Sequence, residues 1–361
     1  MAEYHIAFRA DATSQIGTGH FMRCLTLADA LRQRGAQIRF VSRGLPVHLR
    51  DMLAAKGMEF VPLNSDVVEA PLDDLAHSKW LETSQAQDAR GTVEALGDRK
   101  WDWLVVDHYA LDVRWERAMR GFVEGIMAID DLADRQHDCD VLLDQNYYAD
   151  MQTRYVGKVP ERCRLLLGPR YALLREEFWR VREQVKPRTG EVRRILVFFG
   201  GVDADNYTGL AIQALTGIAN QGMHVDVVIG VQHPYREQIQ QACAAQGYAC
   251  HIQTSRMAEL MAAADLAIGA GGSASWERCC LGLPALLVAL ADNQVDIAKE
   301  LDSIGAGIYI GTKETANSLT FQRAIRDLSG MPDRIAMISQ CAFSLVDGIG
   351  AGRVCQELGA R

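Results

Sequence analysis

The sequence lacks the features typical of nucleic-acid-binding, disulfide-stabilised and membrane-spanning proteins. Its formal net charge is -8, whereas nucleic-acid partners select basic surfaces. Its nine cysteines are an odd number and include no C-x-x-C pair, so neither a disulfide framework nor a zinc knuckle is indicated. No apolar run approaches the roughly 18 residues of a membrane span, and the residues from Met1 to His5 contain no cationic and apolar leader. We therefore expect a cytoplasmic protein with a small-molecule partner, no nucleic acid and no membrane.

Two common nucleotide-binding motifs are also missing. Gly17-x-Gly19 begins like a dinucleotide-binding fingerprint, but Met22 stands where a third small residue is needed. The fingerprint also needs an acidic residue after the second strand to bind ribose, and residues 39–43 read Arg-Phe-Val-Ser-Arg. A Walker A sequence is absent. The sequence therefore does not favour an NAD-dependent enzyme or a P-loop enzyme.

The chain is long enough for two α/β domains. Its 361 residues exceed the usual size of one hydrophobic core, and 48% of them are hydrophobic. Apolar runs alternate with amphipathic helical runs in both halves, which predicts two Rossmann-like domains with parallel sheets. The expected strands are 5–9, 37–42, 103–107, 126–130, 141–144, 195–199, 225–229, 266–268 and 285–290.

A polar stretch at residues 184–191 separates the two patterns, and we expect it to be the interdomain linker. This predicts an N-terminal domain at residues 1–183 and a C-terminal domain at 192–345. Residues 333–359 are expected to be helical, and the part from 346 to 361 is expected to pack back on the first domain. The weakly patterned region 64–100 is expected to hold peripheral helices.

The first of two glycine-rich turns, residues 16–20, lies between an apolar run and a helical run. His20 follows the glycines at the expected helix start, where the helix dipole disfavours a positive charge and leaves a neutral imidazole that can act as a general base. Asp107 ends another strand and could orient His20. The alternatives are a histidine that only hydrogen-bonds a turn carbonyl and an Asp107 that caps a helix.

Other polar residues are expected at the same edge of the first sheet. Asp11 and Tyr109 follow two strands, and ligands of open α/β sheets bind at the carboxyl ends of the strands. With Gly17 and Gly19 they are candidates for substrate binding. Arg23, one turn after His20, could stabilise developing charge or could be a solvated surface arginine.

The second glycine-rich turn, residues 269–273, has the same position in the second half. Backbone amides of Gly271, Gly272 and Ser273 at a helix start would suit a diphosphate. Glu277 lies one turn, about 5 Å, further along and could reach ribose hydroxyls or be an ordinary surface residue. Asn293-Gln294 after the next strand could bind sugar hydroxyls, although Asn293 would also serve as a helix N-cap.

Two aspartate pairs could be interpreted as metal sites. Asp138-x-Asp140 and Asp203-x-Asp205 both lie where loops use aspartates for turns, and neither has a nearby His or Cys ligand. We therefore expect no metal and no cofactor.

The sequence resembles the UDP-2,4-diacetamido-2,4,6-trideoxy-β-L-altropyranose hydrolases of pseudaminic acid biosynthesis over nearly its whole length. The N-terminal block is the most specific part of the match. The matching segments are residues 8–12, 16–20, 22–28, 106–109, 129–131, 144–146, 168–171, 199–203, 271–277 and 293–294.

This resemblance implies two Rossmann-like domains in the GT-B arrangement, as in the glycosyltransferase that makes lipid II, with the active site in the interdomain cleft. It implies metal-independent hydrolysis of the bond between the anomeric carbon and UDP, with inversion, in nonulosonic acid synthesis for flagellin or surface glycans. By the same resemblance His20 is the general base, and Ser273 and Glu277 contact UDP. The loop 254–257, ending at Met257, is implied to meet the uracil.

Other functions remain open from the sequence. An inverting glycosyltransferase would use the same cleft but would need an acceptor site, and a non-catalytic UDP-sugar-binding protein would not need His20. A UDP-sugar 2-epimerase would keep UDP on its product. We expect a monomer, although no residue pattern fixes the oligomeric state.

Overall fold

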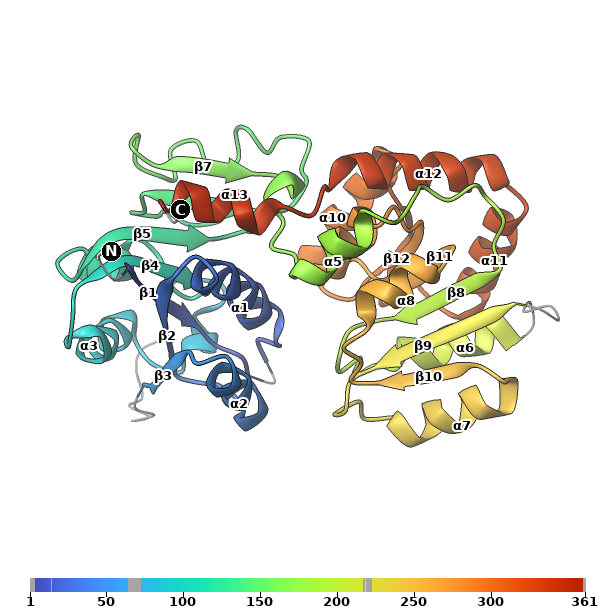
Figure 1. The fold of residues 1–361 in the computed structure, drawn as a ribbon, viewed down its shortest axis with the longest axis horizontal. Coiled ribbons are helices and arrows are strands. Elements are labelled where there is room, and N and C mark those ends of the chain that lie inside the picture. Colours follow the sequence, from blue (N-terminus) through green and yellow to red (C-terminus); the bar gives the residue numbers. More distant parts are fainter. Residues whose placement is uncertain (1–3, 14, 64–72, 217, 219–222, 360–361) are drawn as a thin grey trace. The chain divides into compact units, whose positions relative to one another are not determined.

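The computed structural model describes residues 4–13, 15–63, 73–216, 218 and 223–359. The chain forms two compact units (Figure 1), each built on a parallel sheet. Unit 1 consists of Met1–Asn146, Asp150–Leu173 and Ile349–Arg361, and unit 2 of Tyr147–Ala149 and Leu174–Gly348. Part of the predicted peripheral helical region, residues 64–72, lies outside the described residues.

Unit 1 is built on a seven-stranded parallel sheet in the order β3-β2-β1-β4-β5-β6-β7. Its central strands are apolar and buried, so polar residues occur where the strands end. Because the strands are parallel, their carboxyl ends share one edge of the sheet. The strands are β1 (Tyr4–Ala10), β2 (Ala36–Ser42), β3 (Glu59–Pro62), β4 (Trp101–Asp107), β5 (Val123–Ile129), β6 (Val141–Asp144) and β7 (Arg164–Leu167).

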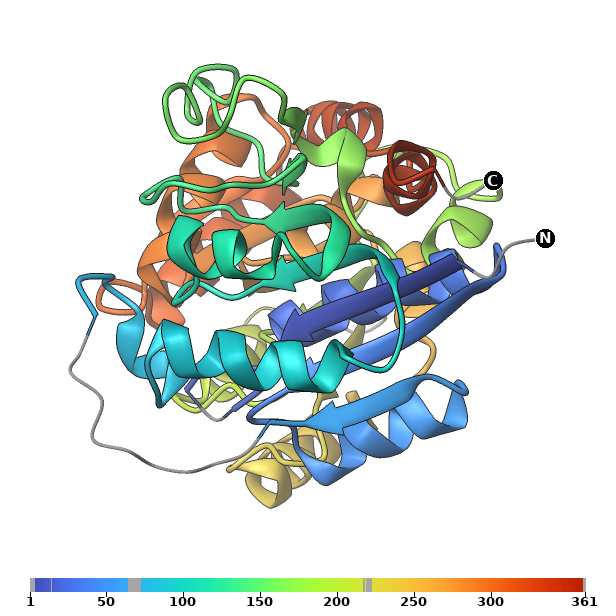
Figure 2. The same ribbon diagram turned by 90° about the vertical axis from the view of Figure 1, so that its left-hand side faces the viewer.

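Helices cover both faces of the first sheet (Figure 2). One core joins the sheet to α1, α2 and α13, and it includes Phe8, Phe21 and Val354. The other core lies under α3 and α4 and includes Trp115. The helices are α1 (Gly19–Arg32), α2 (Val47–Ala55), η1 (Ser78–Leu81), α3 (Gln85–Leu96), α4 (Val113–Met119), η2 (Pro169–Tyr171) and α13 (Gly350–Glu357).

Unit 2 is built on a six-stranded parallel sheet in the order β10-β9-β8-β11-β12-β13. The strands are β8 (Arg194–Phe198), β9 (His224–Ile229), β10 (Ala249–Ile252), β11 (Leu266–Ala270), β12 (Ala285–Ala289) and β13 (Ile308–Thr312). The helices are α5 (Glu176–Arg182), α6 (Tyr207–Thr216), α7 (Arg236–Gln246), α8 (Met257–Ala263), α9 (Ala274–Cys280), α10 (Asp292–Ser303), α11 (Ser318–Ser329) and α12 (Pro332–Leu345).

The predicted linker at residues 184–191 lies inside unit 2, and the change of unit falls between Leu173 and Leu174. Arg188 explains the difference, because its guanidinium donates to the carbonyls of Met261 at 2.8 Å and Ala264 at 3.0 Å. Its backbone N–H also donates to Ser339 Oγ at 2.7 Å. The stretch is polar in sequence because it ties helices together, and it is not a free connector.

The helix expected over residues 333–359 is two helices, which end and begin on either side of residues 346–349. Gly348 has φ 85° there, and α12 belongs to unit 2 whereas α13 belongs to unit 1. By length and composition, Pro332–Glu357 passes as a membrane-span candidate, with a hydropathy of 1.4 in an 18-residue window of which 44% is buried. The expectation that no run approaches that length was therefore too strong.

Candidate functional site

Four aspartates follow the central strands of unit 1 at the carboxyl edge of the sheet. Asp11 follows β1, Asp107 is the last residue of β4, and Asp130 and Asp131 follow β5. Helix α1 begins beside them because Gly17, at φ 76°, turns the chain after β1. This edge holds the first cluster of polar residues that sequence reasoning selected.

His20 and Asp107 form a hydrogen-bonded pair. Nδ1 of His20 lies 2.6 Å from Oδ1 of Asp107, and the imidazole side chain is 11% exposed whereas the carboxylate is buried. Because an ionised carboxylate only accepts hydrogen bonds, the contact favours the tautomer in which Nδ1 carries the hydrogen, and in a neutral imidazole of that form Nε2 has the lone pair. This contact is the one that an orienting role of Asp107 would need, and the role itself stays a prediction.

Arg23 holds Asp107 in its charged form. Nε and Nη2 of Arg23 donate to the two carboxylate oxygens at 2.6 and 2.7 Å, and Nη1 donates to Asp131 at 2.9 Å. Burial alone would raise the pKa of Asp107, but Arg23 and His20 outweigh it and hold the pKa well below its usual range. Arg23 is therefore a buried bridge between two carboxylates and not a solvated surface arginine.

Tyr109 lies against the base. Its ring meets the His20 ring edge-on, with centroids 4.5 Å apart, and its hydroxyl donates to Asp131 Oδ1. Burial raises the pKa of Tyr109, and the neighbouring Asp131 adds to this effect, so the phenol stays protonated. The tyrosine is 3% exposed, so its position is fixed by packing.

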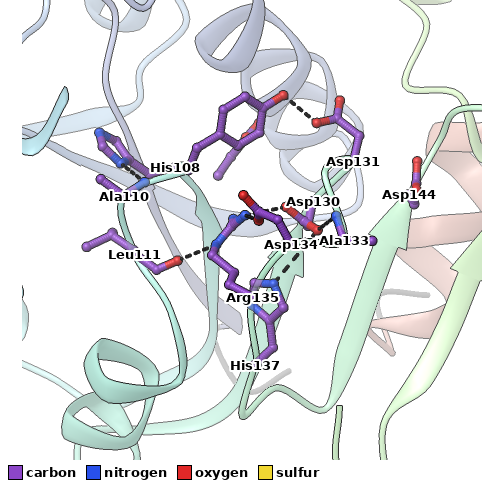
Figure 3. A network of polar contacts seen from close by, with 12 residues as sticks. His108, Ala110, Leu111, Asp130, Asp131, Ala133, Asp134, Arg135, His137 and Asp144 are labelled. Atoms are coloured by element: carbon purple, nitrogen blue, oxygen red, sulfur yellow. Dashed lines mark hydrogen bonds and ion pairs between the residues drawn. The ribbon is translucent and has the colours of Figure 1, made fainter. Parts of the chain in front are cut away.

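A buried network after β5 surrounds Asp130 and Arg135 (Figure 3). Arg135 pairs with Asp130 Oδ1 at 2.7 Å, donates to the carbonyl of Leu111 at 2.9 Å, and lies 5.7 Å from the Tyr109 ring centroid. Ala133, at φ 53°, donates its N–H to Asp130 Oδ2 at 2.9 Å and closes the loop. Sequence reasoning assigned none of these roles.

Asp11 was predicted to bind substrate, but the structure surrounds it with protein groups. Arg9 Nη1 lies 2.7 Å from Oδ1, Ser42 Oγ and the Arg43 N–H donate to the same oxygen at 2.8 and 2.7 Å, and His108 Nε2 lies 3.3 Å from Oδ2. Its side chain is 2% exposed. Asp11 thus ties β1 to the loop after β2, which is a structural role.

The glycines of the first turn are surrounded by open space. A Cβ at Gly17 or Gly19 would meet nothing within 4 Å. At Gly17 the positive φ of 76° still favours glycine. This room beside His20 suits the approach of a ligand to the backbone.

In unit 2 the turn after β11 is packed closely against its neighbours. In β11 itself, just before the turn, a Cβ at Gly269 would lie 2.2 Å from the Phe198 carbonyl oxygen. In the turn, a Cβ at Gly271 would lie 3.1 Å from the Cβ of Ala298. Beneath the turn, the buried Arg278 donates to the Ala270 carbonyl at 2.5 Å and to Ser275 Oγ at 3.0 Å. Burial lowers the pKa of Arg278 to about 10, which leaves it charged near neutrality.

The other predicted residues of unit 2 lie on three helices. Gly272 and Ser273 lead into α9, which carries Glu277, and Met257 begins α8. Arg175 Nη2 lies 3.5 Å from Glu277 Oε1. Burial raises the pKa of Glu277, and Arg175 opposes that rise. Arg175 and Arg278 were not selected from the sequence, where arginines at these positions carry no distinguishing pattern.

Asn293 and Gln294 occupy the first turn of α10, and Ala291, not Asn293, is the N-cap. Asn293 is exposed. Gln294 Oε1 accepts from the Leu290 N–H at 3.1 Å, and its Nε2 would lie 3.4 Å from a Cβ at Gly272. Gln294 thus joins the end of β12 to the glycine turn.

The two aspartate pairs have structural partners. Asp138 and Asp140 pair with Arg120 and Arg162, and Asp203 accepts the Tyr207 and Thr208 N–H groups at 3.0 and 2.8 Å at the start of α6. Within the described part of the chain, no group of three or more His, Cys, Asp or Glu side chains could hold a metal ion.

The two units together define a GT-B fold of the glycosyltransferase type. Residues 194–348 match the family model described as Glycosyltransferase family 28 C-terminal domain. The crystal structure of Acinetobacter baumannii MurG has a TM-score of 0.66 at 15% identity, covering 99% of this chain and 100% of that one. A putative UDP-N-acetylglucosamine 2-epimerase from Listeria monocytogenes gives 0.62 at 12% identity, covering 99% and 96%. At these identities the likeness shows the fold alone.

Two curated proteins are more similar in sequence. The spore coat polysaccharide biosynthesis protein SpsG of Bacillus subtilis is 23% identical over 355 residues, which cover 97% of this chain and 96% of that protein. The UDP-2,4-diacetamido-2,4,6-trideoxy-beta-L-altropyranose hydrolase of Campylobacter jejuni is 28% identical over 203 residues. That match covers 56% of this chain and 62% of the hydrolase.

Proposed function

We propose that the protein is a UDP-sugar hydrolase that releases UDP from UDP-2,4-diacetamido-2,4,6-trideoxy-β-L-altropyranose with inversion. The observation that carries the proposal is the pair formed by His20 Nδ1 and Asp107 Oδ1 at 2.6 Å, at the carboxyl edge of the first sheet. The 28% identity to the Campylobacter jejuni hydrolase supports this choice of reaction and substrate.

In the proposed reaction, Nε2 of His20 accepts a proton from water while the water oxygen attacks the anomeric carbon. The bond from that carbon to the diphosphate oxygen breaks, and UDP leaves with the electron pair. Asp107 holds the imidazole in the required tautomer and stabilises the imidazolium that forms. UDP needs little protonation to leave, so stabilisation of its charge matters more than a general acid.

Unit 2 would bind the UDP end. The Gly271 N–H donates to the Val288 carbonyl at 2.9 Å, so of the three predicted amides only those of Gly272 and Ser273 would face the diphosphate. The buried charge of Arg278 below the turn favours an anion there. Glu277, on the same helix, would contact the ribose, and Asn293 and Gln294 the sugar. Met257 at the start of α8 would lie by the uracil.

The test measures UDP release from the enzymatically made substrate, without an acceptor and with EDTA, for the wild type and His20→Ala. We expect release by the wild type and a loss of at least about a hundredfold in the variant, the scale of a general base. The exposed His48 on α2 provides the control variant, His48→Ala, which should keep full activity. Release of UDP that does not depend on His20 would contradict the assigned base.

An inverting UDP-sugar glycosyltransferase is the second candidate. It is favoured by the match of residues 194–348 to a glycosyltransferase domain and by the nearly full-length similarity to a polysaccharide biosynthesis protein. In that case the wild type would bind UDP but release none from the UDP-sugar until an acceptor is added. A non-catalytic binding protein would release none under either condition.

A further inference from the structure

Three aromatic side chains form a wall beside His20 in unit 1. We define the aromatic wall as His77, Trp80 and Tyr109. Trp80, from η1, stacks on Tyr109 with centroids 5.5 Å apart and meets His20 edge-on at 6.2 Å. His77 meets Trp80 at 4.6 Å and Tyr109 at 5.3 Å. The wall therefore lies next to the base in the proposed reaction.

Among the described residues, protein contacts alone do not complete the wall. His77 and Trp80 are only half-buried, whereas Tyr109 is buried. His77 Nδ1 is buried without a hydrogen-bond partner, and within the described residues the Trp80 indole N–H also lacks one. The indole N–H groups of Trp101 and Trp115, in contrast, donate to Leu96 and Asp88. Two free polar atoms on half-buried rings are typical of a surface that a ligand completes.

His77 is suited to a neutral ligand. Burial lowers its pKa, the nearby Asp134 opposes this, and Arg135 and His20 add to the lowering. A neutral imidazole offers one donor and one acceptor, which matches an amide group. The faces of Trp80 and Tyr109 favour contact with C–H groups, so hydroxyl groups would gain little there.

We propose that His77 and Trp80 form a specificity subsite for the apolar and N-acyl substituents of the sugar. The methyl groups of a deoxygenated ring carbon and of an acetamido group would lie against the rings, and the amide would hydrogen-bond to His77. This proposal rests on the proposed function for the identity of the sugar. It adds two residues of η1 and the turn before it to a site otherwise built from strand ends and α1.

The test compares affinities for UDP and for UDP-2,4-diacetamido-2,4,6-trideoxy-β-L-altropyranose by calorimetry, in a His20→Ala background so that no turnover occurs. Trp80→Ala and His77→Ala should each weaken the UDP-sugar by about tenfold or more and leave UDP unchanged, because only the sugar meets the wall. Trp80→Phe keeps a ring and should recover most of the affinity. UDP-N-acetylglucosamine has a C6 hydroxyl and only one acyl group, so Trp80→Ala and His77→Ala should weaken its binding less than that of the diacetamido sugar.

Phe122→Ala is the matched control. Phe122 is an aromatic residue, 48% exposed, that precedes β5 at the end of the strand opposite Asp130. It should change neither affinity. Because the proposed UDP site lies in unit 2 and the substitutions lie in unit 1, thermal unfolding of each variant checks that the fold of unit 1 is kept.

Three results would overturn the subsite. The first is that the protein with an intact wall binds UDP and the UDP-sugar equally tightly. The second is that neither Trp80→Ala nor His77→Ala changes the affinity for the UDP-sugar. The third is that these variants lose the same affinity for UDP as for the UDP-sugar. The proposed function fails separately, if the protein with His20 intact binds the UDP-sugar more tightly than UDP but releases no UDP from it. In that case a loss on Trp80→Ala would still establish the subsite.

Discussion

Each glycine-rich turn lies between a parallel strand and the helix that follows it, but the two turns differ in what lies around them. At Gly19 a Cβ would meet nothing within 4 Å, and the neighbours of the turn are the charged groups of Arg23 and Asp107. Gly269 at the end of β11 leads into the second turn, and a Cβ there would lie 2.2 Å from a backbone oxygen of the neighbouring strand. The first turn is thus specified by side-chain electrostatics and the second by the close packing of backbone.

This difference separates two kinds of work within one fold. A site for acid–base chemistry needs side chains whose charge is fixed by their neighbours. In unit 1, Arg23 holds Asp107 in its charged form, and Asp131 accepts the hydrogen of the Tyr109 hydroxyl. A site that holds an anion by backbone N–H groups needs the chain itself to approach closely. The first turn should therefore be sensitive to changes of charge, and the second to small additions of volume.

The largest expected effect is that of Asp107→Asn, which removes a charge at nearly constant size. An amide can present its NH₂ to Nδ1 and so favour the wrong tautomer of His20, and we expect kcat for UDP release to fall by roughly 10²- to 10⁴-fold. Thermal unfolding would show whether the Arg23 contacts still hold the fold.

The double variant His20→Ala/Asp107→Asn separates orientation from other roles. If Asp107 acts through His20, the double variant is no slower than His20→Ala, because the two residues work as one unit. A further loss of tenfold or more in the double variant would mean that Asp107 has a catalytic role of its own.

The next effect should be steric and confined to the end of β11 that leads into the second turn. Gly269→Ala places a methyl group against the Phe198 carbonyl and should cost about 1–3 kcal/mol of unfolding free energy. Gly19→Ala, at the first residue of α1 with open space around it, should leave the unfolding free energy nearly unchanged. Urea denaturation of both variants measures the contrast, and similar losses would show that the turns do not differ as described.

A smaller effect is expected for Glu277→Gln. The amide keeps the size of the side chain but has one acceptor oxygen in place of two and no charge. It therefore cannot hold two ribose hydroxyls as a carboxylate does, and UDP affinity should fall by about tenfold. Glu259→Gln on the exposed face of α8 is the control and should leave UDP affinity unaltered. An unchanged affinity of Glu277→Gln by calorimetry would exclude Glu277 from the UDP site.

The smallest effect concerns pH and the charge network of unit 1. Burial lowers the pKa of His137, but Asp130 and Glu116 outweigh it and raise the pKa from 6.5 to about 9. A raised histidine pKa stabilises the folded state fully below pH 6.5, and this stabilisation is lost as the pH rises through 9.

The wild type should therefore lose more stability than His137→Gln between pH 6.5 and 9. Denaturation at both pH values measures the difference, and His48→Gln, at an exposed position, should behave as the wild type. A pH dependence that is the same in His137→Gln and the wild type would mean that His137 is neutral in the folded state.

The sequence predicted the central strands but not the edges of either sheet. β1, β4, β5, β8, β11 and β12 are continuous apolar runs because both faces are covered. The four strands that were missed, β3, β7, β10 and β13, are all edge strands, and their side chains are mostly half-buried or exposed. A half-covered strand has no continuous apolar run, so its sequence resembles a loop.

The candidate site was predictable where glycine turns and strand ends mark it, as for His20 and Asp107. Trp80 and Arg278 were missed because an aromatic residue in a polar region and an arginine in a helix are ordinary in sequence. Asp11 was assigned to the ligand because strand ends usually face it, and only its five protein partners, from β1 to the loops after β2 and β4, show its structural role.

Helix α13 closes a core that begins at the other end of the chain. Val354, Cys355 and Leu358 pack in the same cluster as Phe21 and Leu31, and Arg164 pairs with Glu357 at 2.6 Å. A ribosome makes residues 4–32 first and α13 after the whole of unit 2. Unit 2 can therefore fold during synthesis, whereas the face of α1 that packs on α13 stays uncovered until α13 has been made. Unit 1, which contains β1 and α1, is therefore completed only after unit 2 has been made.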